Sequence, residues 1–192
     1  YKEVCRIVFE LGKFPVVWIG LFGSNETEIS TSTSLGLKDE TLPLRLLNES
    51  YGDGHTLLTN LVSNFLPIIV EDLEDQSFSP SESGIDAVSI GLNSLMAMPL
   101  LAEGTLRGIF LVFASQKSYF SEEEASLLNE VAGDISFAIL YSETHSQVRF
   151  LSNYDPLTGL ANRAVFLDRL EQYIGNHGQL DSKIALLIMN ID

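Results

Sequence analysis

The hydrophobic pattern is clearest over residues 121–153, where it predicts one long helix. Ser121 and Glu124 form a capping box that satisfies free backbone N–H groups at the start of the helix. Asp155 precedes a proline and is disfavoured in a helix, so the helix should end before it. A first apolar stripe would cover a core: Leu128, Val131, Ile135, Ala138 and Ile139. A second has the spacing of a coiled-coil seam: Phe137, Tyr141, Thr144, Val148 and Leu151.

Short helices and strands are predicted before that helix. An apolar face that ends at Gly12 predicts a first helix and consists of Tyr1, Val4, Cys5, Val8 and Leu11. Strands are predicted at residues 14–22, 28–34 and 66–70, helices at 57–65 and 82–90, and a hairpin at 94–101 and 105–114. This order predicts an α+β fold with a central antiparallel sheet, one face of which is covered by the two terminal helices.

Two interpretations of the long helix remain open at this level. It is either a kinked helix packed wholly inside one domain, or a helix that closes one domain, pairs with its copy in a second chain and leads into a second domain at Asp155. The two distinct stripes favour the second interpretation, because a single domain core needs only one of them.

Charge and composition exclude some partners. The 192 residues carry a formal net charge of −15, which disfavours binding to nucleic acid or to an anionic membrane. No apolar run reaches the ~18 residues that a membrane span requires. Cys5 is the only cysteine, so a disulfide within the chain is impossible and a reducing, cytoplasmic location is expected. Tyr1 is an unusual first residue, and we therefore expect a fragment of a longer protein.

Four stretches of residues 1–140 together resemble a GAF domain: VVWIGLF, IIVEDLEDQSFSP, LMAMPLLAEGTLRGIFLVFA and YFSEEEASLLNEVAGDISFAIL. The resemblance implies a small-molecule sensor that forms a homodimer through its terminal helices. It also implies a ligand pocket on the opposite side of the sheet. The candidate lining residues are Trp18, Ile69, Phe78, Ile85, Val88, Leu95, Met96 and Met98.

The identity of a ligand does not follow from this resemblance. The signature of cyclic-nucleotide GAF domains is missing, and bilin-binding relatives need a pocket cysteine, whereas Cys5 lies on the first helix and is expected in the core. Redox-active relatives use several cysteines. His55 and His145 have no second metal ligand at useful spacing, so a structural or surface role is favoured. An acidic cluster is expected to be a solvated loop rather than a cation site: Glu71, Asp72, Glu74 and Asp75.

Residues 153–163, NYDPLTGLANR, are similar to the D-x-L-T-G-L-x-N-R motif with which GGDEF domains begin. The matching residues are Asp155, Leu157, Thr158, Gly159, Leu160, Asn162 and Arg163. In physical terms Asp155 and Thr158 are capping residues, and Gly159 permits a turn. A helix from Asn162 to about Gly175 or Gly178 and a buried strand at 183–191 should follow.

The resemblance implies a parent domain that condenses two GTP molecules into cyclic di-GMP with Mg²⁺ held by carboxylates between two protomers. Within these residues no two glycines are adjacent, so the signature loop is missing, and we expect this fragment to be non-catalytic and to hold no cofactor of its own. The stretch Asn190, Ile191 and Asp192 places an amide where the family has a metal-binding aspartate. A shift of one residue would make Asp192 the relevant acid, and a strand-end role for Asn190 also remains open.

The sequence thus predicts two domains, a GAF domain at 1–150 that includes the signalling helix from about residue 121, and a GGDEF fragment at 151–192. The expected function is a sensor and dimerisation module of a cyclic di-GMP signalling protein. Two alternatives remain: the regulatory part of a GGDEF–EAL phosphodiesterase with a degenerate GGDEF domain, and a dimerisation scaffold without a ligand.

Overall fold

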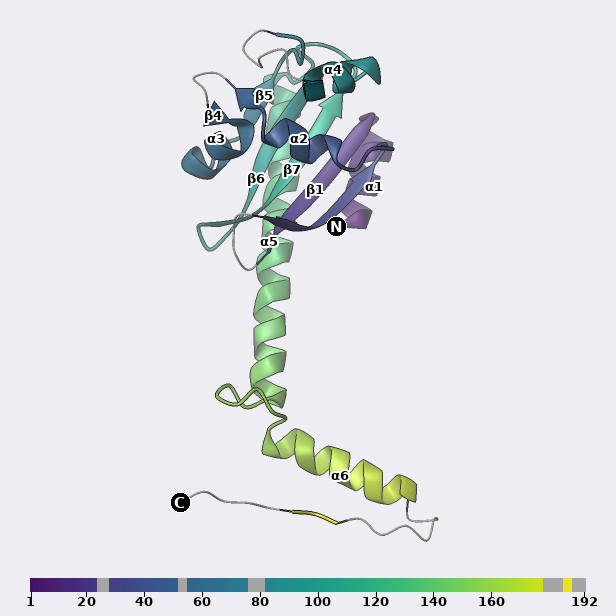
Figure 1. The fold of residues 1–192 in the computed structure, drawn as a ribbon, viewed down its shortest axis with the longest axis vertical. Helices are drawn as coiled ribbons and strands as arrows, with labels where there is room; N and C mark the ends of the chain where they lie inside the picture. The colour runs from purple at the N-terminus through teal and green to yellow at the C-terminus, as the bar shows by residue number, and fades with distance from the viewer. Residues whose placement is uncertain (24–27, 52–54, 76–81, 178–184, 188–192) are drawn as a thin grey trace. The chain divides into compact units, whose positions relative to one another are not determined.

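The structure is a computed structural model, and it describes residues 1–23, 28–51, 55–75, 82–177 and 185–187 (Figure 1). The chain divides into two compact units, Tyr1–Leu140 and Tyr141–Asp192. The boundary lies within the long helix α5, Glu122–Asn153, which is continuous over 32 residues.

A five-stranded antiparallel sheet forms the centre of the first unit. Its strands are β1 (Val16–Phe22), β2 (Ile29–Leu35), β5 (Ile68–Val70), β6 (Ser94–Ala102) and β7 (Thr105–Ala114). They lie in the order β2-β1-β7-β6-β5. β6 and β7 are joined by the tight turn at Glu103 and Gly104, and Met98 pairs with Phe110 in the middle of the hairpin. The predicted α+β fold and hairpin are confirmed.

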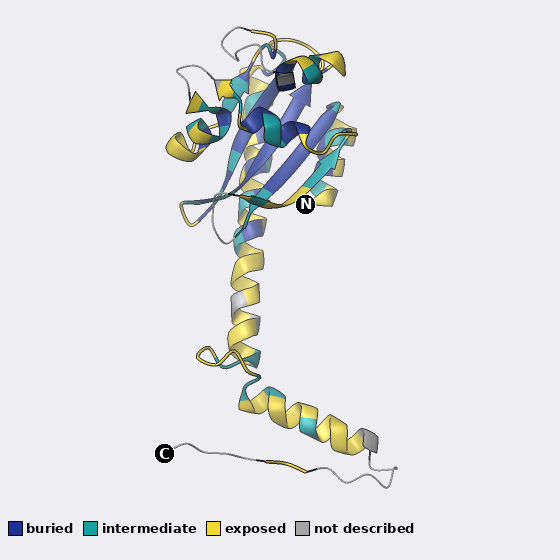
Figure 2. Ribbon diagram, viewed as in Figure 1, coloured by how far each residue is buried: buried dark blue, intermediate teal, exposed yellow. Residues whose placement is uncertain are grey.

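Helices cover both faces of the sheet. On one face α1 (Lys2–Gly12) and the first part of α5 pack against the strands, as predicted. On the other face lie α2 (Leu42–Leu47), α3 (Leu57–Asn64) and α4 (Glu82–Ser89). Because each face has its own apolar core, nearly every residue of β6 and β7 is buried (Figure 2).

Helix α2 was not predicted from the sequence. It has only six residues, begins with Pro43 in its first turn, and contributes Leu42, Leu46 and Leu47 to the core. Such a helix is too short to show the repeated spacing by which a helix is recognised. A two-stranded ribbon, β3 (Ser50–Tyr51) with β4 (His55–Thr56), also separates α2 from α3. His55 lies in β4, and Thr56 caps α3 by accepting from the Thr59 N–H at 3.1 Å.

Three details of the terminal helices differ from the prediction. In α1, Leu11 is 79% exposed and does not join the core face, and Lys13 rather than glycine takes the left-handed conformation, with φ 55°. In α5, Ala138 was expected in the buried stripe but is exposed, whereas Ala132 is buried. The reason is that the buried stripe follows the 3.6-residue period of the helix, and its members are Leu128, Ala132, Ile135 and Ile139.

The predicted start of α5 is confirmed, but only half of the capping box forms. The Ser121 Oγ accepts from the Glu124 N–H at 3.4 Å, whereas the Ser121 N–H donates to the carbonyl of Tyr119. The carboxylate oxygen Oε2 of Glu124 is buried and has no hydrogen-bond partner among the described residues. Its side chain lies instead in a groove between α1 and α5.

The second unit contains the end of α5, a compact turn, and α6 (Arg163–His177). α6 begins one residue after Asn162 and ends at His177, beyond Gly175 and immediately before Gly178, the second of the two predicted ends. Residues 185–187 form neither helix nor strand and are exposed, so the predicted strand is not seen in them. The rest of that prediction, 183, 184 and 188–191, and Gly178 lie outside the described residues.

Candidate functional site

The residues predicted to line one pocket do not lie on one face of the sheet. Trp18 and Leu95 belong to the core under α2, α3 and α4, and Val88 packs against it. Met96 and Met98 belong to the other core, and Ile69 packs there as well. The grouping was wrong for a simple reason: side chains along a strand alternate between faces, so Leu95 and Met96 must point in opposite directions.

Two further candidates do not contribute to a common site. Ile85 on α4 is 62% exposed, so it does not line an interior pocket of the described chain. Phe78 lies outside the described residues. The face that the GAF resemblance assigns to a ligand therefore retains Trp18, Val88 and Leu95 from the predicted set.

Trp18 is the most informative residue of this face. Its ring lies over Gly20, since a Cβ atom at that glycine would come within 2.2 Å of the indole. Its side chain is fully buried, and its Nε1 has no acceptor among the described residues. A buried donor without an acceptor costs about 1–3 kcal/mol, so such a group is an unusual feature of a core.

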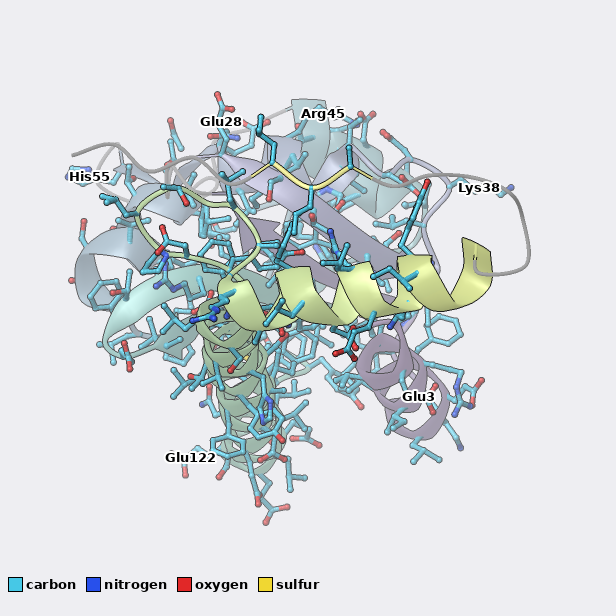
Figure 3. All side chains as sticks on the ribbon, turned by 90° about the horizontal axis from the view of Figure 1, so that it is seen from below. Glu3, Glu28, Lys38, Arg45, His55 and Glu122 are labelled. Atoms are coloured by element: carbon cyan, nitrogen blue, oxygen red, sulfur yellow. The ribbon has the colours of Figure 1, made fainter. Side chains whose placement is uncertain are left out.

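The predicted metal and redox candidates give no site. Cys5 lies in the core between α1 and the sheet, and burial raises the pKa of its thiol to about 11. His55 and His145 are both exposed, and His55 lies at the periphery of the domain (Figure 3). Within the described ranges, no three His, Cys, Asp or Glu residues are grouped so that they could hold a metal ion.

The acidic cluster is tied to a lysine from another part of the chain. Lys117 contacts Asp72 at 3.0 Å and Glu74 at 2.6 Å. The Glu74 amide and the Lys117 ammonium lower the pKa of the Asp72 carboxyl. Glu71 accepts from the Ser118 hydroxyl at 3.2 Å. These bonds hold the β7–α5 connection against the segment after β5, so the predicted solvated loop is also tied to another part of the chain.

The second apolar stripe of α5 is exposed in the isolated chain. Phe137, Tyr141, Val148 and Leu151 are each more than half exposed. Thr144 is also exposed. Such a row of apolar side chains on a helix is typical of a surface that another helix covers. The pairing itself remains a prediction.

The 155–163 motif forms a closed turn between α5 and α6. The Asp155 Oδ1 accepts from the Thr158 N–H and the Thr158 hydroxyl, both at 2.8 Å, and from the Leu157 N–H at 3.2 Å. The Thr158 groups, followed by the Leu157 N–H, lower the pKa of the Asp155 carboxyl. Gly159 has φ 68°, a conformation that glycine adopts at no steric cost, and the turn closes with the Asp155 N–H on the Leu160 carbonyl at 2.8 Å.

Asn162 connects the two helices directly. Its Oδ1 accepts from the Val165 N–H at 3.0 Å and so caps the start of α6. Its Nδ2 donates to the carbonyl of Ser152, in the last turn of α5, at 2.7 Å. Sequence reasoning identified Asn162 through the motif but missed its second bond, because a bond across ten residues leaves no local signal. Within the described ranges Arg163 has no ion pair.

The predicted metal-binding stretch, Asn190, Ile191 and Asp192, lies outside the described residues. None of the described helices is long and apolar enough to cross a membrane.

Comparison with known proteins identifies the two segments. Residues 1–140 match the GAF domain family, and residues 152–192 match the family described as diguanylate cyclase, GGDEF domain. The chain therefore belongs to the GAF domain family and carries a GGDEF segment after α5. The diguanylate cyclase DgcP of Pseudomonas aeruginosa is 27% identical, with 82% of this chain and 25% of that protein covered. The chain thus spans about a quarter of the length of this relative.

Two solved structures show the same fold as the first unit. One is a domain assigned to a two-component sensor histidine kinase of Sinorhizobium meliloti 1021, with a TM-score of 0.57 at 23% identity, covering 78% of this chain and 94% of that one. The other is the photoproduct state of GAF3 from Slr1393 of Synechocystis sp. PCC6803, with a TM-score of 0.57 at 14% identity, covering 76% and 94%. At these identities the likeness concerns the fold alone, so the ligand has to be argued from this chain.

Proposed function

We propose that this chain is the sensor and relay segment of a cyclic di-GMP signalling protein. The GAF domain binds a small molecule, the chain forms a homodimer through its terminal helices, and α5 carries the change to a GGDEF domain that uses Mg²⁺ and GTP. The observation that carries this proposal is the continuity of α5, whose residues run from the buried Leu128 to the closed turn at Asp155 without a break.

A ligand on the face under α2, α3 and α4 is supported by the unpaired indole of Trp18. A polar ligand atom that accepts from the Nε1 would remove the cost of the buried donor. The free energy of unfolding of the ligand-bound domain would then be higher than that of the empty domain. The test is a thermal-unfolding screen of the purified chain against a metabolite panel, with mass spectrometry of molecules that co-purify. Any hit should lose at least tenfold in affinity in the Trp18→Phe variant, which keeps an aromatic ring and removes the donor.

A homodimer is supported by apolar side chains on the outer surfaces of both terminal helices. Ile7 and Leu11 on α1 and Leu127 on α5 are exposed, and they line a groove of about 280 Å³. A second copy could bury this groove in the first unit, and the seam of α5 offers a separate apolar row for the same kind of pairing. Sedimentation of the chain should give a dimer, and Val148→Glu should weaken it because a carboxylate would enter the apolar seam. Ser146→Glu, which places the same carboxylate at an exposed position outside the seam, is the matched control.

The relay is tested by changing the helical phase of α5. One residue inserted between Tyr141 and Leu151 rotates everything after it by ~100°, whereas seven inserted residues preserve a coiled-coil repeat. In the longer protein with its complete GGDEF domain, the single insertion should uncouple cyclic di-GMP production from the ligand, and the heptad insertion should not. If both insertions leave regulation unchanged, the relay proposal is wrong.

A scaffold without a ligand is the second candidate, and one observation favours it. The face under α2, α3 and α4 is filled by large side chains that are fully buried, among them Leu46, Leu61 and Phe113. If no compound shifts the unfolding temperature and nothing co-purifies, while the chain still dimerises, the scaffold is the better description.

A further inference from the structure

The two edges of the sheet differ in how they are protected. β5 has three residues, too short to pair with another chain over any length. β2 has seven residues, Ile29–Leu35, and contains neither a charged residue nor a proline, the side chains with which proteins usually block an open edge. Among the described strands β2 pairs with β1 alone, so its outer backbone groups face away from the sheet.

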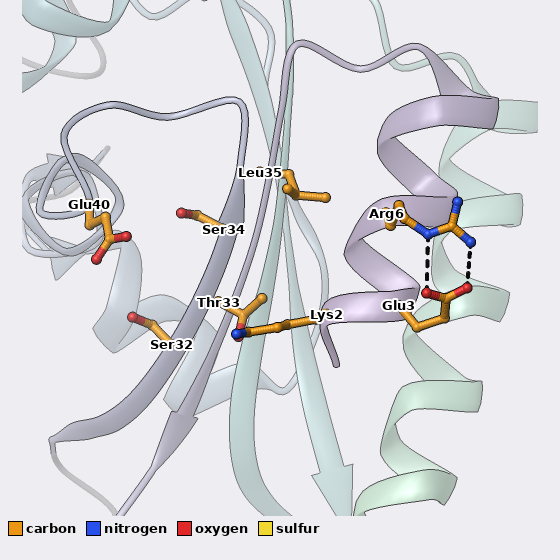
Figure 4. A pocket seen from close by; sticks show the side chains of 8 residues that line it. All are labelled: Lys2, Glu3, Arg6, Ser32, Thr33, Ser34, Leu35 and Glu40. Carbon is orange, nitrogen blue, oxygen red and sulfur yellow. Dashed lines mark hydrogen bonds and ion pairs between the residues drawn. The ribbon is translucent and has the colours of Figure 1, made fainter.

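A groove of about 530 Å³ lies along this open edge (Figure 4). Ser32 and Ser34, opposite Gly20 and Trp18 in the register, line it from one face of the sheet. Thr33 and Leu35 line it from the face that carries α1. A groove in contact with both sets of side chains must run past the edge of the strand, because neighbouring residues of a strand point to opposite faces.

The two sides of the groove carry opposite unpaired charges. Lys2 reaches it from α1, on the side of Thr33, and Glu40 lies on the side of Ser32 and Ser34 (Figure 4). Both side chains are exposed, and neither forms an ion pair with any residue that the structure describes. Arg6 also lines the groove, but its guanidinium is already bound by Glu3 and by Glu10, the latter at 2.7 Å.

We propose that the outer edge of β2 binds an extended peptide segment, which adds a sixth strand to the sheet and carries an acidic and a basic side chain on opposite faces. Backbone hydrogen bonds to β2 supply the affinity, and alternate side chains supply the selectivity. The acidic side chain lies beside Lys2 and the basic one beside Glu40. In an extended peptide, an acidic and a basic residue lie on opposite faces when they are adjacent or three positions apart. When they are two positions apart, they lie on the same face and do not meet this requirement. This proposal does not depend on the sensor function.

The test uses two fluorescein-labelled ten-residue peptides made of threonine with one glutamate and one lysine. In the first peptide the charged residues are adjacent, and in the second they are separated by one residue. Fluorescence anisotropy with the 192-residue chain should show saturable binding of the first peptide, two- to fivefold tighter than binding of the second. This factor corresponds to one exposed charge pair.

Variants of the chain separate the charges from the backbone edge. Lys2→Glu and Glu40→Lys should each weaken binding of the first peptide two- to fivefold. The double variant should restore binding of the first peptide. If the peptide pairs with β2 in a register shifted by one residue, each of its side chains moves to the opposite face, where it meets the exchanged charge. Ser32→Pro and Thr33→Pro each remove one backbone N–H from β2. Because successive N–H groups of a strand point in opposite directions, one of the two points to the open edge and the other to β1. The variant that removes the outward N–H should keep the fold and lose at least tenfold in affinity.

Three outcomes would overturn the proposal. One is that neither peptide binds saturably to the folded chain. Another is that binding is indifferent to both charge reversals, which concern exposed residues and do not endanger the fold. The third is that the chain self-associates and the charge reversals change this association, which would make a second copy the occupant of the edge.

Discussion

The two apolar stripes of α5 lie on one continuous helix and have opposite environments. Up to residue 140 its stripe is buried against the sheet, with Ile135 only 2% exposed. Beyond residue 140 its seam is open, with Tyr141 58% exposed. Both stripes have spacing that favours a helix, and the helix forms through both. The comparison shows that periodicity predicts the helix, whereas burial requires a partner that the chain itself supplies only to the first stripe.

Loss of a side chain from the buried stripe should have the largest effect. We expect Ile135→Ala to lower the free energy of unfolding by about 2–5 kcal/mol, because it removes buried methyl groups and leaves a cavity. Urea unfolding, followed by the fluorescence of Trp18 in the core, measures this change. Phe137→Ala is the control, because Phe137 is 69% exposed and its loss should change the stability of dilute protein by less than about 0.5 kcal/mol. Equal losses would contradict the division into two environments.

Loss of the carboxylate from the closed turn should have a smaller, local effect. In Asp155→Ala, three donors from Leu157 and Thr158 lose their acceptor. At ~1 kcal/mol for each bond, amide hydrogen exchange at these residues should accelerate by about tenfold or more.

The same Asp155→Ala variant also tests whether the units unfold independently. The urea transition reported by Trp18 should not move, since the substitution lies in the other unit. A transition shifted by more than ~0.5 kcal/mol would show that the turn stabilises the GAF domain as well. Asp155→Asn retains one acceptor oxygen and should give an intermediate exchange rate.

The helix cap at the beginning of α5 offers a third comparison. Ser121→Ala removes the acceptor of the Glu124 N–H and should lower the stability of the first unit by about 1 kcal/mol in the same urea experiment. Ser121→Asp should preserve the cap and benefit from the positive end of the helix dipole. Should the alanine variant be as stable as the unchanged chain, the 3.4 Å contact contributes nothing.

The smallest effect is the dependence of the turn on pH. The pKa of Asp155 is lowered in the folded turn, so the ionised form is stabilised there. This contribution is present above the ordinary pKa of 3.8 and is lost as the pH falls through the lowered value. Titration of the Asp155 carboxyl carbon by NMR should give a midpoint below 3.8. In Thr158→Val, which removes the hydroxyl donor, the midpoint should move back towards 3.8.

Much of the fold could be predicted because its signals are local. The start and length of α5, the β6–β7 hairpin and the turn from Asp155 to Gly159 depend on residues within a few positions of one another. In each of these, a cap, a tight turn or a repeated apolar spacing involves only neighbouring residues, so the pattern is visible in the sequence.

The candidate ligand site was predicted less well. Leu95, Met96 and Met98 were assigned to one pocket, although strand alternation separates the first from the other two. Ile85 was expected inside and is exposed, because α4 presents it away from the sheet. The unpaired Nε1 of Trp18, the second bond of Asn162, and the charges of Lys2 and Glu40 beside β2 gave no signal in the sequence.

By itself the sequence determined which segments become helices and strands and which families they resemble, because caps, turns and periodicity act over short distances along the chain. Only the tertiary structure decided that Ala132 rather than Ala138 is buried in the first stripe of α5, which face each strand residue occupies, and that the edge of β2 stays open. Those outcomes depend on what packs beside each element, and the neighbours are brought together by residues far apart in sequence.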